Sequence, residues 1–143
     1  MVLLAKDIVA RDFLSLPRNA NALETAKQMK SRQHGCVIVV AADGRPEGIV
    51  TEWDYLAKLI AEAKDPATAR LEDIMSTGLV SVKASDGIDF VSEMMSKRGI
   101  RRVLVMEDGK VLGIITAKIV LSHLKEYVDR VSAQIARLQT PRY

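Results

Sequence analysis

The stretch Gly48-Ile49-Val50-Thr51 recurs almost unchanged as Gly113-Ile114-Ile115-Thr116, 65 positions further along the chain. The turn before it recurs at the same offset, because Asp43-Gly44-Arg45 matches Asp108-Gly109-Lys110. An offset that holds over a strand and its preceding turn is typical of an internal repeat. The sequence therefore predicts two copies of one structural unit.

Nearer the N-terminus the offset is 66, since Lys6-Asp7-Ile8 matches Glu72-Asp73-Ile74. The first copy therefore carries one extra residue. A unit of about 65 residues buries too little surface to be stable alone. We therefore expect the two copies to pack into one body with pseudo-twofold symmetry.

Each copy is predicted to be a β-α-β-β-α unit, so the fold class is mixed α/β (α+β) with an extended C-terminal helix. The β-branched run Cys36-Val37-Ile38-Val39-Val40 favours a buried strand. Asn21 and Glu24 have the spacing of a capping box at the start of a helix. The predicted strands are residues 13–16, 36–40, 47–50, 79–82, 103–106 and 111–115, and the predicted helices are 22–31, 88–97 and two that begin at 51 and 116. The predicted boundaries are 6–62 for the first repeat, 63–70 for a connector, 71–125 for the second repeat and 126–143 for the helix extension and tail.

The composition is that of an ordinary globular protein. The chain has 143 residues, of which 48% are hydrophobic and 27% charged, which excludes disordered and collagen-like classes. No apolar run approaches the roughly 20 residues of a membrane-spanning helix, so we expect no membrane association. The single cysteine, Cys36, cannot form an internal disulfide, which favours a cytoplasmic location. The net charge of +3 is mild and the signs are mixed along the chain, so we expect no nucleic-acid partner.

The segment Thr51-Glu52-Trp53-Asp54 allows two interpretations. A hydroxyl at a helix start with a carboxylate three residues later is a capping box, which satisfies free backbone donors. The same helix start attracts phosphate, and the Thr51 hydroxyl can donate to a phosphate oxygen. An ionised Asp54 carboxylate can accept two hydroxyl donors from a vicinal diol such as a ribose. A phosphate site beside a diol site would bind a nucleotide.

The tandem order of these motifs resembles a pair of CBS domains (a Bateman module) of the small stand-alone type. The resemblance is carried by Asp7-Ile8, by Asp73-Ile74-Met75-Ser76 and by Gly-Ile-Val-Thr-x-x-Asp at residues 48–54, and it extends from about Lys6 to Leu124. It implies a non-catalytic regulatory module that binds an adenosine-containing nucleotide such as AMP, ADP or ATP between its repeats. No other cofactor is implied.

In CBS pairs the aspartate of this motif holds the ribose, and the cleft is walled by the strand starts of the other repeat. The resemblance therefore implies that one cleft contains Thr51, Asp54, Arg101 and Arg102. The other cleft would contain Thr116, Ile119, Gly35 and Cys36, which lack the carboxylate and the arginines. This asymmetry predicts one intact site and one degenerate site.

The base of the ligand would need a flat apolar slot. The resemblance places Ile49, Leu79, Val80 and Ile100 along it, with Gly78 allowing close approach of the backbone. The alternative is that these residues are ordinary core. Trp53, the only tryptophan, would flank the ribose or base, or else cover a helix interface.

The last helix carries a heptad pattern that extends beyond the second repeat. Its apolar residues alternate in steps of three and four at Leu121, Leu124, Val128, Val131, Ile135 and Leu138. This pattern predicts packing on a partner subunit, with a homodimer as the expected assembly. The alternative is that the helix docks back on its own domain. The tail, residues 140–143, is expected to be loose.

No residue pattern nominates an enzyme. His34 and Cys36 share one face of a strand start, but no third residue orients them as a nucleophilic pair. His123 has no second metal ligand at helical spacing. The alternative to ligand sensing is therefore an oligomerisation or partner-docking scaffold whose clefts stay empty.

Overall fold

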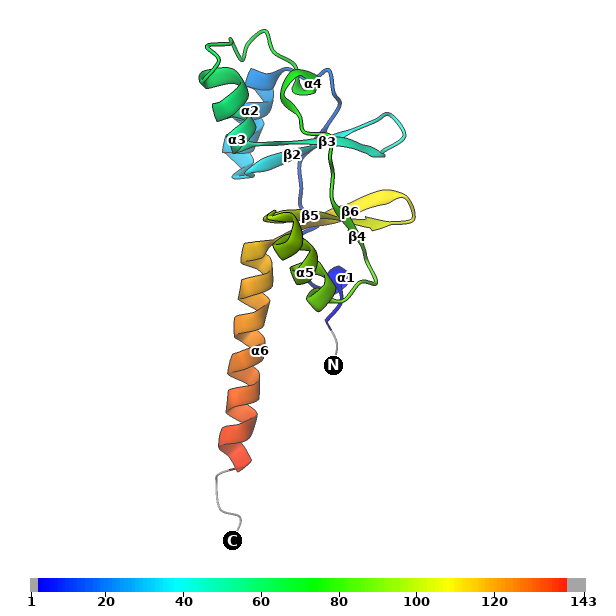
Figure 1. The fold of residues 1–143 in the computed structure, drawn as a ribbon, viewed down its shortest axis with the longest axis vertical. Coiled ribbons are helices and arrows are strands. Elements are labelled where there is room, and N and C mark those ends of the chain that lie inside the picture. The colour runs from blue at the N-terminus through cyan, green and yellow to red at the C-terminus, as the bar shows by residue number, and fades with distance from the viewer. Residues whose placement is uncertain (1–2, 139–143) are drawn as a thin grey trace.

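The fold is given by a computed structural model that describes residues 3–138 (Figure 1). Two three-stranded sheets lie one above the other, each with its own helices, and one long helix extends from the second unit. The mixed α/β fold with two repeats is thus confirmed. The elements, in chain order, are α1 (Ala5–Ile8), β1 (Ser15–Leu16), α2 (Ala22–Arg32), β2 (Cys36–Val40), β3 (Pro46–Thr51), α3 (Glu52–Tyr55) with a π-helical turn η1 (Leu56–Ile60), α4 (Leu71–Ile74), β4 (Ser81–Lys83), α5 (Ile88–Arg98), β5 (Arg102–Glu107), β6 (Lys110–Thr116) and α6 (Ala117–Leu138).

The two sheets have the same topology and the same register. In each, the first strand is parallel to the central strand, and the third is antiparallel to it. Cys36 pairs with Thr51 in the first sheet, and Arg102 pairs with Thr116 in the second. Because Thr51 and Thr116 are equivalent in the sequence, Cys36 and Arg102 are equivalent as well. The repeat detected in the sequence therefore holds residue by residue in the strands.

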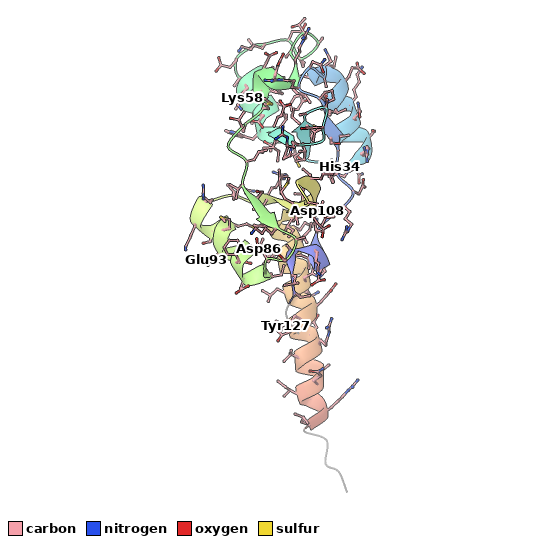
Figure 2. All side chains as sticks on the ribbon, turned by 90° about the vertical axis from the view of Figure 1, so that its right-hand side faces the viewer. His34, Lys58, Asp86, Glu93, Asp108 and Tyr127 are labelled. Carbon is pink, nitrogen blue, oxygen red and sulfur yellow. The ribbon has the colours of Figure 1, made fainter. Side chains whose placement is uncertain are left out.

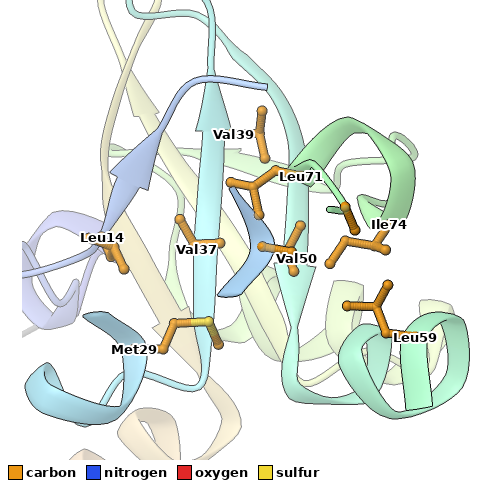
Figure 3. Close-up of a cluster of buried hydrophobic side chains, with 10 residues drawn as sticks. Leu14, Met29, Val37, Val39, Val50, Leu59, Leu71 and Ile74 are labelled. Carbon is orange, nitrogen blue, oxygen red and sulfur yellow. The ribbon is translucent and has the colours of Figure 1, made fainter. Parts of the chain in front are cut away.

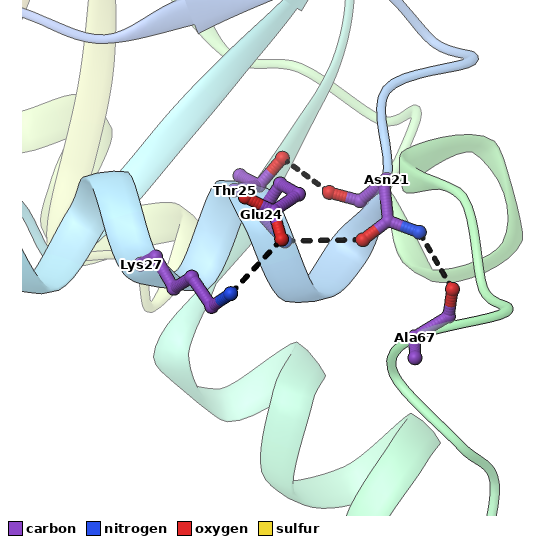
Figure 4. Close-up of polar contacts among 5 residues, drawn as sticks. All are labelled: Asn21, Glu24, Thr25, Lys27 and Ala67. Atoms are coloured by element: carbon purple, nitrogen blue, oxygen red, sulfur yellow. Dashed lines mark hydrogen bonds and ion pairs between the residues drawn. The ribbon is translucent and has the colours of Figure 1, made fainter.

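Asn21 begins α2 and also holds the connector between the repeats (Figure 4). Its side-chain oxygen accepts from the N–H of Glu24 at 3.0 Å, and its side-chain NH2 donates to the carbonyl of Ala67 at 2.7 Å. The Glu24 carboxylate pairs with Lys27 at 3.0 Å instead of reaching back to Asn21. The predicted capping box is therefore formed only on the asparagine side.

Each repeat has its own apolar core, but the short leading helices are exchanged between them. The core around β2 and β3 includes Leu71 and Ile74 of α4, which follow the connector in sequence (Figure 3). The core around β5 and β6 includes Ala5 and Ile8 of α1, at the start of the chain. The packing units therefore differ from the sequence repeats by one helix each.

Two backbone crossings accompany this exchange. Ile49 of β3 exchanges two backbone hydrogen bonds with Ser76, at 3.0 and 2.9 Å. The equivalent Ile114 of β6 exchanges two with Ala10, at 3.1 and 2.9 Å. A Cβ added to Gly113 would collide with the carbonyl oxygen of Ala10. The repeated glycine of the Gly-Ile motif is explained by the close passage of the crossing chain.

A third apolar cluster joins the two repeats. Its buried members are Cys36, Ile38, Leu104 and Ile114, so the central strand of each sheet contributes. Ile38 and Leu104 occupy equivalent positions, as expected for two copies that pack around a pseudo-twofold axis. The predicted association of the repeats into one body is thus observed.

The long helix α6 leaves the body after its first turns. Ile119 and Val120 still pack against the core of repeat 2, but no residue of α6 is buried. The apolar side chains from Leu121 onward are exposed apart from the half-buried Val131, with 65% exposure for Leu121 and 83% for Leu138. The helix therefore does not dock back on its own domain. The predicted loose tail, residues 140–143, lies outside the described residues, and over residues 3–138 no helix has the length and apolar character needed to cross a membrane.

Candidate functional site

Thr51 and Asp54 form the start of α3, directly after strand β3. The N–H of Thr51 donates to Asp54 Oδ2 at 2.7 Å, and the Thr51 hydroxyl lies 3.2 Å from the same oxygen. The Asp54 side chain is only 6% exposed. The carboxylate thus satisfies backbone and side-chain donors at the helix start, as in the capping interpretation.

Lys58 contacts the other oxygen of this carboxylate. Its Nζ lies 2.9 Å from Asp54 Oδ1 and donates to the carbonyl oxygen of Ile74 at 2.7 Å. Lys58 (labelled in Figure 2) comes from the π-helical turn that follows α3, and Ile74 ends α4. The buried negative charge is therefore balanced by an ammonium group, which offsets part of the cost of burying it.

Arg102 of repeat 2 reaches the same end of repeat 1. A Cβ added to Gly35 would lie 2.9 Å from the Arg102 guanidinium and 2.5 Å from the Glu52 carboxylate. Burial raises the pKa of the Cys36 thiol, and the nearby charges of Arg102 and Glu52 act on it in opposite directions. Arg102 thus lies beside the residue that follows Thr51 in the chain.

Arg101 is the residue before β5, and its backbone lies beside the start of α6. Its carbonyl accepts from the N–H of Ala117 at 2.9 Å, just as the carbonyl of Gly35 accepts from Glu52 at 3.2 Å. Arg101 and Gly35 are therefore equivalent, as the sequence repeat predicts. The structure differs from the predicted grouping of the two clefts at one point, because Arg102 lies beside Gly35 and Cys36.

Both arginines are free to bind an anion. Between residues 3 and 138, neither Arg101 nor Arg102 has a carboxylate oxygen within 4.0 Å. Arg101 is exposed and Arg102 is half-buried. Guanidinium groups without an internal partner are suited to bidentate contacts with phosphate.

The equivalent position in repeat 2 has different chemistry. The Thr116 hydroxyl accepts from the N–H of Ile119 at 3.2 Å, so it caps its own helix. The Ile119 side chain packs against the apolar core of repeat 2. Thr116 therefore has no neighbouring carboxylate at this spacing, unlike Thr51.

The predicted apolar slot is only partly assembled. Ile49 and Leu79 both pack on the cluster that joins the repeats. Val80 and Ile100 pack instead against the core of repeat 2. A Cβ on Gly78 would meet no atom within 4 Å, so the backbone there faces open space.

Trp53 lies on the outer side of α3. It is 68% exposed, although Asp54 beside it is buried. Trp53 therefore does not cover a helix interface within this chain.

A pocket lies within repeat 1. It measures about 510 Å³ and lies between α2 and α3. Its lining is formed by Ala26, Met29, Lys30, Gln33, His34, Gly35, Glu52 and Tyr55. His34 Nε2 is buried there without a hydrogen-bond partner, and the Asp12 carboxylate lies 3.8 Å away. Across residues 3–138, no three His, Cys, Asp or Glu side chains gather as a metal site.

Two residues at the site were not predicted from the sequence. Lys58 follows Asp54 by four positions, which is the spacing of an ion pair on a helix, so its contact could have been inferred. Glu52 and Arg102 both lie close to Gly35, but this proximity joins two repeats and leaves no local signal in the sequence.

Comparison with known proteins identifies the family. The CBS domain profile matches residues 5–61 and 71–126. The chain therefore belongs to the CBS-domain family and carries two CBS domains in tandem, the arrangement of a regulatory module.

Solved structures and a curated relative share this arrangement. The chain aligns with a CBS domain pair in complex with 5′-methylthioadenosine and S-adenosyl-L-methionine, at 27% identity and a TM-score of 0.79, covering 89% of this chain and 99% of that one. A hexameric CBS-CP12 protein from bloom-forming cyanobacteria aligns at 31% identity with a TM-score of 0.77, covering 85% of this chain and 67% of that one. An uncharacterized protein of Methanopyrus kandleri is 28% identical over 134 residues, 93% of this chain and 68% of the relative.

Proposed function

We propose that this CBS pair is a regulatory sensor, not a catalyst, that binds an adenosine-containing ligand at the Thr51–Asp54 helix start. The observation that carries the proposal is the buried Asp54 carboxylate at the start of α3, together with the Arg102 guanidinium of the other repeat, which lies close to Gly35 and Glu52 at the same helix start. The ribose would bind Asp54, and any phosphates would bind Arg102 and Arg101. The ligand is the only small molecule required, and the lone buried thiol is consistent with a reducing cytoplasm.

Ligand entry would rearrange the donors around Asp54. A carboxylate offers about four lone-pair directions, and Thr51 and Lys58 already occupy three. A diol needs two acceptors, so binding would displace the Thr51 hydroxyl or the Lys58 ammonium. Because Lys58 also donates to Ile74, its release would loosen the contact between α3 and α4. This coupling supplies a route from ligand to conformation.

The experiment is a thermal-shift and calorimetric screen with AMP, ADP, ATP, S-adenosylmethionine, 5′-methylthioadenosine and NAD. A ligand at about 100 times its dissociation constant stabilises the folded state by roughly 2.7 kcal/mol. We expect Asp54→Asn to abolish this stabilisation for every adenosine compound. The fluorescence of the single Trp53 gives an independent readout, since it precedes Asp54 in the chain.

Asp73→Asn is the matched control for Asp54→Asn. Asp73 accepts from the N–H of Arg70 at 2.8 Å, so it has the same role at the start of α4. The Asp73→Asn variant therefore reports the loss of stability caused by removing a capping hydrogen bond, while the Thr51–Asp54 site stays unchanged. If no compound binds, the ligand proposal fails and the clefts are empty, as in a docking scaffold. If both variants weaken binding equally, Asp54 makes no specific contact with the ligand and the proposed site is wrong.

A second pair of variants tests the arginines. Arg102→Gln should weaken binding of phosphate-bearing ligands while leaving the uncharged 5′-methylthioadenosine unaffected. Lys110→Gln removes one positive charge at the β5–β6 hairpin and controls for net charge. Equal effects of these two variants would show that Arg102 makes no specific contact.

The expected homodimer belongs to the same proposal. Exposed apolar side chains lie on the helices of both repeats, namely Trp53, Leu56, Ile60, Phe90, Leu121, Leu124, Tyr127 and Val128. Such a row along one molecule marks an interaction surface. A second copy of the chain would cover it.

A further inference from the structure

The helix α6 is longer than the body of repeat 2 can use. It has 22 residues, about 33 Å at 1.5 Å per residue, and projects away from both sheets (Figures 1 and 2). Tyr127, midway along it, is 53% exposed. Most of the stability of a helix in a protein comes from packing of its apolar face, so the exposed part of α6 favours a partner.

The apolar residues of α6 follow the heptad spacing without a break over six positions. Leu121, Val128 and Ile135 take position a, and Leu124, Val131 and Leu138 take position d. Two of the three a residues are β-branched and two of the three d residues are leucine. In a parallel coiled coil, this combination favours two strands.

The flanking positions of α6 permit such a pair. In a parallel pair, Tyr127 at position g lies near Ser132 at position e of the other helix, so no like charges meet there. The charged residues Glu126, Asp129, Arg130 and Arg137 fall at positions b, c and f, on the outer face, and Lys125 at position e lies near Val120 at position g of the other helix. The seam is therefore apolar and can pair with itself.

Exposed apolar side chains occur on both repeats as well as on α6. Phe90 on α5 is 44% exposed, and Trp53 and Ile60 near α3 are 68% and 72% exposed. Helices α3 and α6 lie on the same side of the molecule, on the left of Figure 1. An antiparallel pair of α6 helices would carry the two bodies to opposite ends. A parallel pair brings like repeats together, so one partner covers both the seam and these side chains.

We propose that α6 pairs with α6 of a second copy in a parallel two-stranded coiled coil, with repeat 2 beside repeat 2 and repeat 1 beside repeat 1. This inference rests on the proposed homodimer and adds its orientation. Both Thr51–Asp54 sites then lie in the same half of the assembly, at the end away from the coiled coil.

The strength of the pairing is tested by light scattering and analytical ultracentrifugation of the full chain. Val128→Glu places two like charges within the seam and should weaken the dimer by at least about 100-fold. Ala133→Glu adds the same charge at position f and should leave the dimer unchanged. Far-UV circular dichroism verifies that both variants are folded.

The orientation is tested by disulfide trapping in a Cys36→Ser background. Leu138→Cys should form an intermolecular disulfide under mild oxidation, because equal d positions meet only in a parallel pair. Arg137→Cys, on the outer face, should not. Crosslinking only when Leu121→Cys and Leu138→Cys are combined would show an antiparallel pair and overturn the inference.

The outcomes separate this inference from the proposed function. A monomeric wild-type chain overturns the dimer and its orientation together, whereas adenosine binding is measured independently. A dimer that Val128→Glu does not weaken leaves the homodimer in place but overturns the role of α6.

Discussion

Gly48 and Gly113 occupy equivalent positions, but the crossing chain approaches them differently. A Cβ on Gly113 would meet the backbone oxygen of Ala10, which is fixed by hydrogen bonds to Ile114. A Cβ on Gly48 would meet the Met75 sulfur at 2.7 Å and the Ser76 carbonyl oxygen at 3.0 Å. A flexible methionine can move, whereas a paired backbone cannot.

Gly113→Ala should therefore lower the free energy of unfolding by about 3 kcal/mol or more, because the collision is with fixed backbone. Gly48→Ala should cost less, about 1–2 kcal/mol. Urea denaturation measures both, and Gly78→Ala, with open space at its Cβ, is the control for stability. Equal losses at Gly48 and Gly113 would contradict the explanation.

Tyr55 illustrates how burial changes the titration of one residue. Its hydroxyl donates to the carbonyl of Ala22 at 2.6 Å, which links α3 to α2. Burial raises the pKa of Tyr55 to about 12. The ordinary tyrosine pKa is about 10, so the folded state retains this proton to higher pH than the unfolded chain does.

The stability contributed by Tyr55 is therefore fully present below about pH 10 and is lost as the pH rises toward 12. Comparing wild type with Tyr55→Phe over this range removes the contribution of the lysines, which titrate in both proteins. We expect the phenylalanine variant to lose less stability between pH 9 and 12. Tyr127→Phe, at an exposed position, should follow the wild type.

At the scale of elements, strands and long helices were predictable and short helices were not. The β-branched run at residues 36–40 and the cap at Asn21 placed β2 and α2 within one residue. Helices α1 and α4 have four residues each, too few for a helical periodicity to be recognised. Their partners lie in the other repeat, which no local pattern can indicate.

The site was predictable to a similar degree. The spacing of Thr51 and Asp54 located the helix start and its capping geometry correctly. The alignment of the repeats correctly made Arg101 equivalent to Gly35. The position of Arg102 close to Gly35 and Glu52 depends on how the two sheets face each other, so only the structure could supply it. The ligand-binding roles of all ten predicted residues remain predictions.

The exchanged helices allow a test that links a substitution to the distant repeat. Ile8→Ala should leave a cavity in the core of repeat 2, and Ile74→Ala should leave one in repeat 1. Each should cost about 2–5 kcal/mol of unfolding free energy. Hydrogen exchange should then accelerate most in β4–β6 for Ile8→Ala and most in β1–β3 for Ile74→Ala. The opposite assignment, with each residue affecting its own sequence repeat, would contradict the exchange.

At the scale of the whole molecule, sensing requires that the ligand prefers one arrangement over another. A ligand shifts the equilibrium between two arrangements only by its difference in affinity for them. The Thr51–Asp54 site lies where residues of both repeats meet, and Lys58 links it to α4. A change at the site can therefore alter the relative orientation of the two repeats. Because β6 runs directly into α6, it can also alter the direction in which α6 projects from repeat 2.

The exchange of α1 and α4 also constrains how such a chain is made and how it can be divided. During synthesis the first sheet cannot complete its core until Ile74 has left the ribosome, whereas the second sheet closes on a helix made at the very beginning. A fragment holding one repeat would keep a helix it cannot use and lack the one it needs. Two such fragments could satisfy each other only by trading these helices, as in a domain-swapped dimer. Joining them in one chain turns that concentration-dependent encounter into an intramolecular step.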